Sequence, residues 1–321
     1  MPTFFSALPS RRGTACSQAG ILWLLSAVLF VAPAQAYACA CGCGVFGVGT
    51  LPLLPNIEGG TAFLEYDFMD QNQNWSGTGT SPAADNPDKD LRTNFFTAGA
   101  QYMFDGGWGV MAEIPFWDRS FTTAVTPGNI DTFHHDALGD VRLMGVYSGF
   151  SPDLSSGIVF GTKLPTGDSS YPGFDRDTEI GSGSTDLLLG FFHAGSLTPD
   201  NKWGWFAQAI GDHAVAETGS YRPGDEADGA LGIEYAAGLP IGEAAVMPSL
   251  QLVDSWRLRD SGADADPPNS GYERVFAAPG AELDISAWKI YGAVEVPLYQ
   301  HFDGNQVAAS VLVKVTVGYA F

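Results

Sequence analysis

Residues 311–321 read Val-Leu-Val-Lys-Val-Thr-Val-Gly-Tyr-Ala-Phe. The side chains of this stretch alternate strictly, because every second residue from Val311 to Phe321 is branched or aromatic, whereas the residues between them include Lys314 and Thr316. Successive side chains of a β-strand point to opposite faces, so one face of this strand suits lipid and the other suits a lumen. The stretch therefore predicts the closing strand of a membrane-spanning barrel.

The same alternation recurs through the chain, for example in residues 62–69, 108–116 and 290–298. It predicts an all-β fold over residues 58–321: a transmembrane antiparallel up-and-down β-barrel of about twelve strands. The alternative is a soluble secreted β-sandwich, whose strands usually run about 5–6 residues. The expected strands lie near 58–74, 90–104, 107–121, 138–150, 154–165, 182–195, 202–214, 228–239, 243–258, 272–286, 288–301 and 308–321.

The connections between these strands alternate in length. We expect long extracellular loops, rich in Gly, Ser, Asp and Pro, opposite short periplasmic turns, with both termini of the chain in the periplasm. The long segments are 75–89, 122–137, 166–181, 215–227 and 259–271. The short turns are Asp105-Gly106, Ser151-Pro152-Asp153, Pro199-Asp200-Asn201, Leu239-Pro240-Ile241 and Asp303-Gly304.

The first 36 residues have the three parts of a signal peptide. Arg11 and Arg12 precede an apolar run over 21–31, and Ala34-Gln35-Ala36 forms a cleavage site. The alternative is a retained transmembrane anchor, but the run is shorter than the about 20 residues that a spanning helix needs. We expect cleavage before Tyr37 and localisation in the outer membrane.

The mature chain is strongly acidic. Removal of residues 1–36 leaves 13 basic and 36 acidic residues, which is a net charge of −23. Nucleic acids and anionic phosphates are bound by clustered Lys and Arg, so they are not expected partners. The charge favours cations, or neutral solutes that pass through an acidic lumen.

The alternation also assigns ionisable residues to the lumen face, because a midplane Arg or Lys facing lipid would cost about 2–4 kcal/mol. Two interpretations remain open: a charged pore lining that screens solutes, or pairs that fill a narrow barrel. The lumen-lining candidates are Glu65, Asp67, Arg92, Glu113, Arg142, Lys163, Asp186, Glu234, Glu295 and Lys314.

Three cysteines follow the predicted cleavage site, in a segment (37–57) that we expect to lie in the periplasm. Cys39, Cys41 and Cys43 are separated by single small residues. Thiolates are soft ligands, so the triplet is a candidate Cu(I) or Zn(II) site. The alternatives are a disulfide, which leaves one thiol for a partner, and lipidation at Cys39.

No catalytic pattern is found in the sequence. It lacks a Gly-x-Ser-x-Gly nucleophile elbow and a phosphate-binding P-loop, and His193, His213 and His301 fall on different expected strands. We therefore expect that the protein is not an enzyme.

Several short motifs carry a family resemblance. The runs 139–143 (Gly-Asp-Val-Arg-Leu), 161–168 (Gly-Thr-Lys-Leu-Pro-Thr-Gly-Asp), 183–186 (Gly-Ser-Thr-Asp) and 113–116 (Glu-Ile-Pro-Phe) resemble the outer-membrane family named for the MetA pathway of phenol degradation. The resemblance spans residues from about Glu58 to Phe321 by strand order. It implies a barrel of the twelve-stranded type and transport of aromatic or other apolar compounds.

Three hypotheses of function follow. The first is an outer-membrane channel or transporter for small hydrophobic or aromatic solutes, a porin-like barrel that contacts outer-membrane lipid. Phe321 resembles the C-terminal signal that barrel-assembly machinery recognises. The second is a metal-linked barrel with the cysteine site in the periplasm. The third is a structural barrel that anchors a periplasmic partner through residues 37–57.

Overall fold

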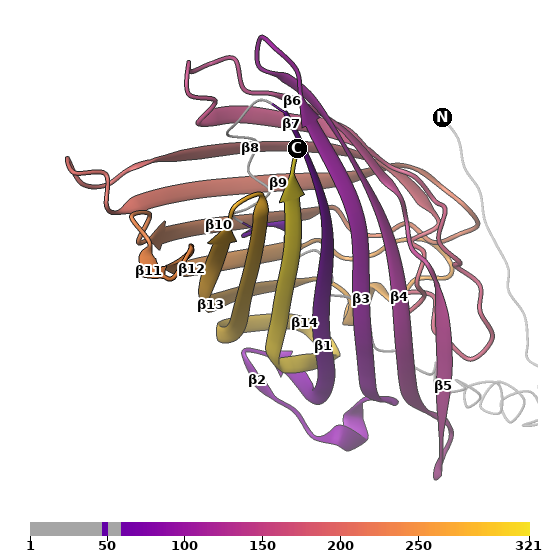
Figure 1. Cartoon of the computed structure of the whole chain (residues 1–321). Helices are drawn as coiled ribbons and strands as arrows, with labels where there is room; N and C mark the ends of the chain where they lie inside the picture. Colours follow the sequence, from indigo (N-terminus) through magenta and orange to yellow (C-terminus); the bar gives the residue numbers. More distant parts are fainter. Residues whose placement is uncertain (1–46, 51–58) are drawn as a thin grey trace, which may run out of the picture. The chain divides into compact units, whose positions relative to one another are not determined.

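The computed structural model describes residues 47–50 and 59–321 (Figure 1). The predicted signal peptide and the cysteine triplet lie outside these residues. The described strands are β1 (Gly59–Gly77), β2 (Gly79–Thr80), β3 (Asp88–Met103), β4 (Trp108–Thr126), β5 (Asn129–Leu138), β6 (Arg142–Tyr147), β7 (Ser156–Lys163), β8 (Ser184–Ser196), β9 (Gly204–Glu217), β10 (Glu226–Glu234), β11 (Leu239–Ile241), β12 (Ala244–Arg257), β13 (Tyr272–Ile285) and β14 (Trp288–Ala320), with short 3-10 helices η3 (Ala83–Asp85) and η4 (Pro267–Asn269).

The strands form one closed antiparallel ring. Neighbours pair in the order β10-β9-β8-β7-β6-β4-β3-β1-β14-β13-β12, and β10 pairs with β12 to close it. Strand β14 is a hairpin, since its first arm pairs with β13 and its second with β1, and the turn between the arms contains Gly304 at φ 65°. The eleven ring elements therefore make twelve passes, which confirms the predicted barrel.

The C-terminal strand closes the barrel at the register expected from its alternation. Gly60 and Phe321 exchange two main-chain hydrogen bonds of 2.9 Å, and further along Glu65 lies opposite Thr316 and Asp67 opposite Lys314. Because the side-chain period is two, this register turns Glu65, Asp67, Lys314 and Thr316 to the same inner face. All four side chains are buried.

Two connections differ from the expectation. The segment 122–137 is largely a hairpin extension of β4 and β5, in which Thr122 pairs with Thr132 around Gly128 at φ 85°. Its β-branched residues favour a paired strand over an irregular loop. The turn Asp303-Gly304 lies beside the long connection 258–271, where Asp303 N donates to Gly271 O at 3.1 Å. It therefore belongs to the end of the barrel that carries the long loops, and its assignment to the periplasmic end is wrong.

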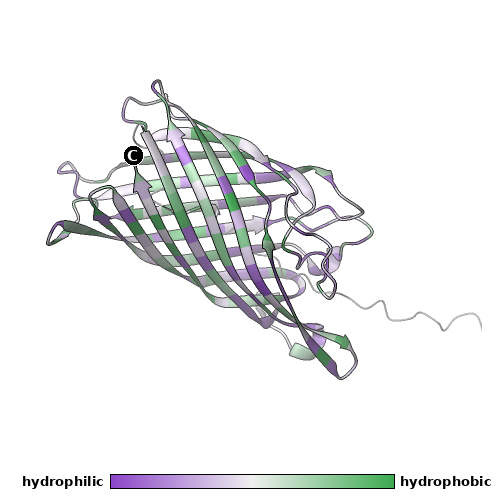
Figure 2. Cartoon of the chain, turned by 45° about the vertical axis from the view of Figure 1, so that its right-hand side comes forward, coloured by the Kyte–Doolittle hydropathy of each residue, from purple (hydrophilic) through white to green (hydrophobic). Residues whose placement is uncertain are grey.

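The outer wall is an apolar belt. Figure 2 shows hydrophobic and hydrophilic residues in alternating bands along the strands, and the large apolar residues of these bands are exposed on the outside. Leu64 and Leu189 are each 66% exposed although they are large and apolar, a pattern that suits lipid contact. Among the helices of the described residues, none is both long and apolar enough to cross a membrane.

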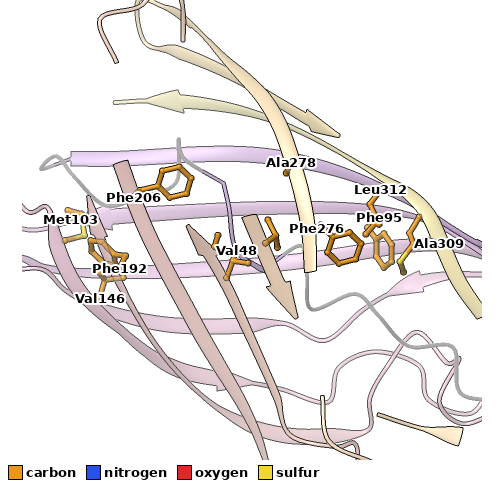
Figure 3. Close-up of a cluster of buried hydrophobic side chains, with 13 residues drawn as sticks. Val48, Phe95, Met103, Val146, Phe192, Phe206, Phe276, Ala278, Ala309 and Leu312 are labelled. Carbon is orange, nitrogen blue, oxygen red and sulfur yellow. The ribbon is translucent and has the colours of Figure 1, made fainter. Parts of the chain in front are cut away.

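Part of the interior is filled with apolar side chains from all around the ring. Met103, Val146, Phe192 and Phe206 belong to one buried cluster, and Figure 3 shows Val48 among these inward-pointing side chains. Side chains can just fill a barrel of about eight strands, so a ring of twelve passes keeps some free space beside this packing. The packing leaves the free space of the lumen beside the charged residues and toward the long loops.

Candidate functional site

A charged row crosses the inner wall of four adjacent strands. Glu113 on β4 lies opposite Arg142 on β6, Arg142 opposite Lys163 on β7, and Lys163 opposite Asp186 on β8. Lys163 Nζ forms an ion pair with Asp186 and another with Asp212 Oδ2 at 2.9 Å. Arg142 Nη1 lies 3.9 Å from Glu113 Oε2. The row is held by strand pairing, so its order of charges is fixed.

A second charged group lies on β1 and β14. Lys314 Nζ is 3.8 Å from Glu65 Oε2, and Thr316 Oγ1 donates to the same oxygen at 2.9 Å. Asp67 and Glu295 are also buried here. Three carboxylates therefore surround one lysine, and the group has an excess of negative charge.

Residues 47–50, which we call the inner segment, run inside the ring. Lys314 Nζ donates to Val48 O at 3.1 Å and to Thr50 Oγ1 at 2.8 Å. Gln251 Nε2 donates to Gly49 O, and Gly49 N donates to Gln208 Oε1, both at 3.2 Å. The inner segment thus spans between side chains of β9, β12 and β14 and narrows the lumen.

The motif residues of the family resemblance meet at Asp140, between β5 and β6. Its Oδ1 accepts a hydrogen bond from Gly167 N at 2.9 Å, and its Oδ2 accepts from Ser182 N at 2.8 Å and Ser182 Oγ at 2.5 Å. A Cβ on Gly167 would lie 2.6 Å from Gly181 Cα, so glycine is required for this close approach. Asp140 therefore fastens both ends of the connection 164–183.

This connection and the neighbouring 218–225, together the loop cap, fold over the lumen. Arg119 Nη1 on β4 donates to Thr178 O at 2.5 Å and to Glu179 O at 3.0 Å. Arg176 stacks on the Tyr221 ring at 4.3 Å. Tyr221 Oη donates to Asp260 Oδ2 at 2.8 Å, and Arg257 Nη2 donates to Asp260 Oδ1 at 2.7 Å. Arginine contacts thus hold the cap to the inner wall.

A cavity of about 200 Å³ lies between the inner segment, the charged row and the loop cap. Phe95, Trp117 and Tyr221 contribute aromatic surface, and the Phe95 and Trp117 rings meet edge to face with centroids 4.9 Å apart. Nine carboxylate and five basic side chains also line it. A dry cavity of about 150 Å³ accommodates benzene in another protein, so this space is large enough for a single aromatic ring.

Acids of the loop cap have raised pKa values. Burial raises the pKa of Glu179 to about 8, with a further contribution from Asp168. Burial, followed by the negative charge of Asp177, raises the pKa of Asp175 to about 7. The cap therefore buries carboxyl groups that lack full compensation by cations.

The structure brings together six of the predicted lumen residues at the cavity: Glu65, Asp67, Glu113, Arg142, Lys163 and Asp186. Glu295 and Lys314 are buried next to Glu65. Glu234 occupies an inward position on β10, opposite Gly204. Arg92 differs, because it is exposed between the buried Leu91 and Thr93 and so faces outward. Beyond the apolar belt a strand meets water on its outer face, which allows an outward arginine.

Sequence reasoning missed Arg119, Asp140, Arg176 and Asp212 as cavity residues. Asp212 follows the alternation of β9 and was open to the same argument as Asp186. Arg119 likewise follows the alternation of β4 that places Glu113 inside. Asp140 and Arg176 lie in connections, where periodicity gives no signal.

The described residues provide no test of metal binding by the cysteines or of anchoring through residues 37–57. Cys39, Cys41 and Cys43 lie outside the described residues. Within 47–50 and 59–321, no group of three or more His, Cys, Asp or Glu side chains is arranged to hold a metal ion. Both hypotheses stay predictions.

The ring, its apolar belt and the enclosed cavity define a membrane β-barrel of the outer-membrane type. No family model and no curated protein matches the chain. In fold it is similar to the COG4313 outer membrane channel from Pseudomonas putida F1, with a TM-score of 0.62 and 12% identity over 85% of this chain and 100% of that chain. The toluene transporter TbuX from Ralstonia pickettii also matches, with a TM-score of 0.43 and 12% identity over 89% and 97% of the two chains.

Proposed function

We propose that the chain is an outer-membrane channel for small aromatic or apolar solutes. The observation that carries this proposal is the cavity of about 200 Å³, with aromatic walls, inside a closed ring whose outer surface is apolar. A catalytic role is not proposed, because the cavity residues serve to hold the inner segment, the loop cap and one another.

We infer the class of solute from the size of the cavity and from the side chains that line it. Phe95 and Trp117 present ring edges and faces to a space that accommodates about one benzene-sized molecule. The short motifs that resemble the phenol-degradation family imply the same class of solute, and we extend that class to this chain as part of the proposal.

The location and assembly belong to the same proposal. Export would follow cleavage after Ala36, and the barrel would insert with Phe321 as the residue read by barrel-assembly machinery. Phe321 suits this role because its side chain is 67% exposed beside the closing seam with Gly60.

The test is solute uptake by intact cells. Apolar solutes cross plain lipid, so liposomes give a poor contrast, whereas cells with or without the chain report entry through the outer membrane. We expect faster uptake of a radiolabelled monoaromatic compound, supplied at low concentration, in the cells that produce the chain. Equal uptake, with the folded protein present in the outer membrane, would contradict the proposal.

A further inference from the structure

Three acids of the cavity wall have a buried carboxylate oxygen with no hydrogen-bond partner among the described residues. They are Asp67 Oδ1, Asp186 Oδ1 and Glu179 Oε2. Their residues are 2%, 1% and 7% exposed. A buried acceptor without a donor is costly, and such a group in a native protein calls for an explanation, often an absent ion or ligand.

The basic side chains of the wall do not supply the missing donors. Lys163 pairs with Asp186 through the other carboxylate oxygen and with Asp212. Arg119 and Arg176 donate to main-chain carbonyls of the loop cap. Nine carboxyl groups face five basic groups around one cavity, so acidic groups are in excess, and Glu179 adds its negative charge above its pKa of about 8.

Aromatic surface lies in the same cavity. Phe95 and Trp117 line the space into which Asp67 and Asp186 also project. Aromatic faces attract cations as well as apolar groups. The cavity thus offers two kinds of recognition at once, namely ring contacts and unsatisfied carboxylate acceptors.

We propose that this cavity selects solutes in which an aromatic ring carries a positively charged N–H donor group, as in an arylalkylammonium ion, over aromatic anions. This inference deepens the channel function and rests on it. The ring contacts Phe95 and Trp117, and the ammonium group donates to an open oxygen of Asp67, Asp186 or Glu179. An aromatic carboxylate meets the same oxygens with like charge and is repelled.

The experiment measures reversal potentials of the mature protein in planar lipid bilayers under a salt gradient at pH 8.5, which lies above the pKa of about 8 that burial gives Glu179. KCl is compared with benzylammonium chloride and with potassium benzoate. The benzylammonium and benzoate ions have similar rings and opposite charges. We expect the wild-type cation-to-anion permeability ratio to exceed about 5, as for a pore lined with acidic side chains, and to stay high when benzylammonium replaces potassium. Benzoate should permeate less than chloride.

Two variants and a control assign the effect to the cavity. Asp67→Asn and Glu179→Gln each remove one charge without changing shape, and each should lower the ratio about 2–3-fold, since the local potential falls with each charge. Glu179 lies in the loop cap, so its variant keeps the test decisive if Asp67→Asn fails to fold. Asp153→Asn, in an exposed turn away from the cavity, should leave the ratio unchanged.

The outcomes separate this inference from the channel function. A conducting channel with a ratio at or below one, or with a ratio that neither cavity variant changes, would overturn the cation preference and leave the channel intact. Absence of current in every salt would count against the channel itself, and the cation preference would fall with it.

Discussion

Lys314 on β14 holds Val48 of the inner segment in the lumen, with its Nζ donating to the Val48 carbonyl oxygen at 3.1 Å. The same ammonium group contacts Thr50 Oγ1 and Glu65. One buried lysine therefore ties a segment near the N-terminus to the closing strand at the C-terminus. The inner segment is held in the lumen by these polar contacts and by the packing of Val48 in the buried apolar cluster.

Gly49→Ala should release the inner segment. Gly49 has φ 78°, and a Cβ there would lie 2.9 Å from the Gln251 side chain. A left-handed backbone costs a non-glycine residue about 1–2 kcal/mol, close to a tenfold shift between the docked and released states. We expect a higher open probability in single-channel recordings.

Gly47→Ala is the matched control for this variant. Gly47 belongs to the same segment, but a Cβ there meets its nearest atom, Arg142 Nη1, at 3.5 Å, an ordinary contact. Equal recordings from Gly49→Ala and the wild type would show that the inner segment does not limit the current.

Lys163→Met should destabilise the barrel. The substitution leaves Asp186 and Asp212 as buried carboxylates without their shared cation. Removal of one partner from a buried ion pair typically costs about 3–5 kcal/mol. We expect a lower midpoint of urea unfolding in detergent micelles, with much of the loss recovered in the double variant that also carries Asp186→Asn. A double variant as unstable as Lys163→Met would contradict the assigned charge pairing.

The loop cap should loosen as the pH rises. Burial raises the pKa of Asp175 to about 7 from an ordinary 3.8, and that of Glu179 to about 8 from 4.5. The folded cap therefore holds protons that the unfolded cap releases, so its stabilisation is complete below about pH 4 and is lost as the pH approaches 7–8.

Hydrogen exchange measures this loosening. After correction for the intrinsic rate, amides of residues 166–183 should exchange faster at pH 8.5 than at pH 5, and Asp175→Asn should reduce the difference because its amide does not ionise. Protection that is the same at both pH values would contradict the account of the cap.

The strands could be predicted from the sequence because their signal is local. Alternation from Val311 to Phe321 sets the closing strand by itself, and the predicted inner positions of Glu65, Lys163 and Asp186 follow from the same period. The predicted lumen position of Arg92 is wrong because the outer face of its strand meets water there rather than lipid. Its part of β3 lies beyond the apolar belt, where water meets the outer face.

The closure of the cavity could not be predicted from the sequence. Asp140 contacts Gly167 and Ser182, and Arg119 contacts Thr178 and Glu179. These partners are far apart in the sequence and meet only because the barrel brings their strands and loops together. The short motifs 139–143 and 161–168 contain Asp140 and Gly167. Only the structure shows that these residues fasten one loop over the lumen, because it brings distant connections together.

The cysteine triplet gives an independent prediction about the mature protein. We expect Cys39, Cys41 and Cys43 to bind copper(I) or zinc, since three closely spaced thiolates converge readily on a soft ion. Metal analysis with thiol titration should show stoichiometric metal that is lost when all three are changed to serine. Metal-free protein with a disulfide would assign the triplet to tethering.

Blocking the cavity shows most directly whether solutes pass through it. Thr97→Cys places a thiol at its wall, and Asp200→Cys places one in an exposed turn as the control, both in a chain whose native cysteines at 39, 41 and 43 are serine. Cells are treated with a bulky thiol reagent, and uptake of a monoaromatic solute is measured. We expect that labelling of Thr97→Cys abolishes the uptake that the chain provides, whereas labelling of Asp200→Cys does not. Unchanged uptake through fully labelled Thr97→Cys would show that solutes do not pass through this cavity.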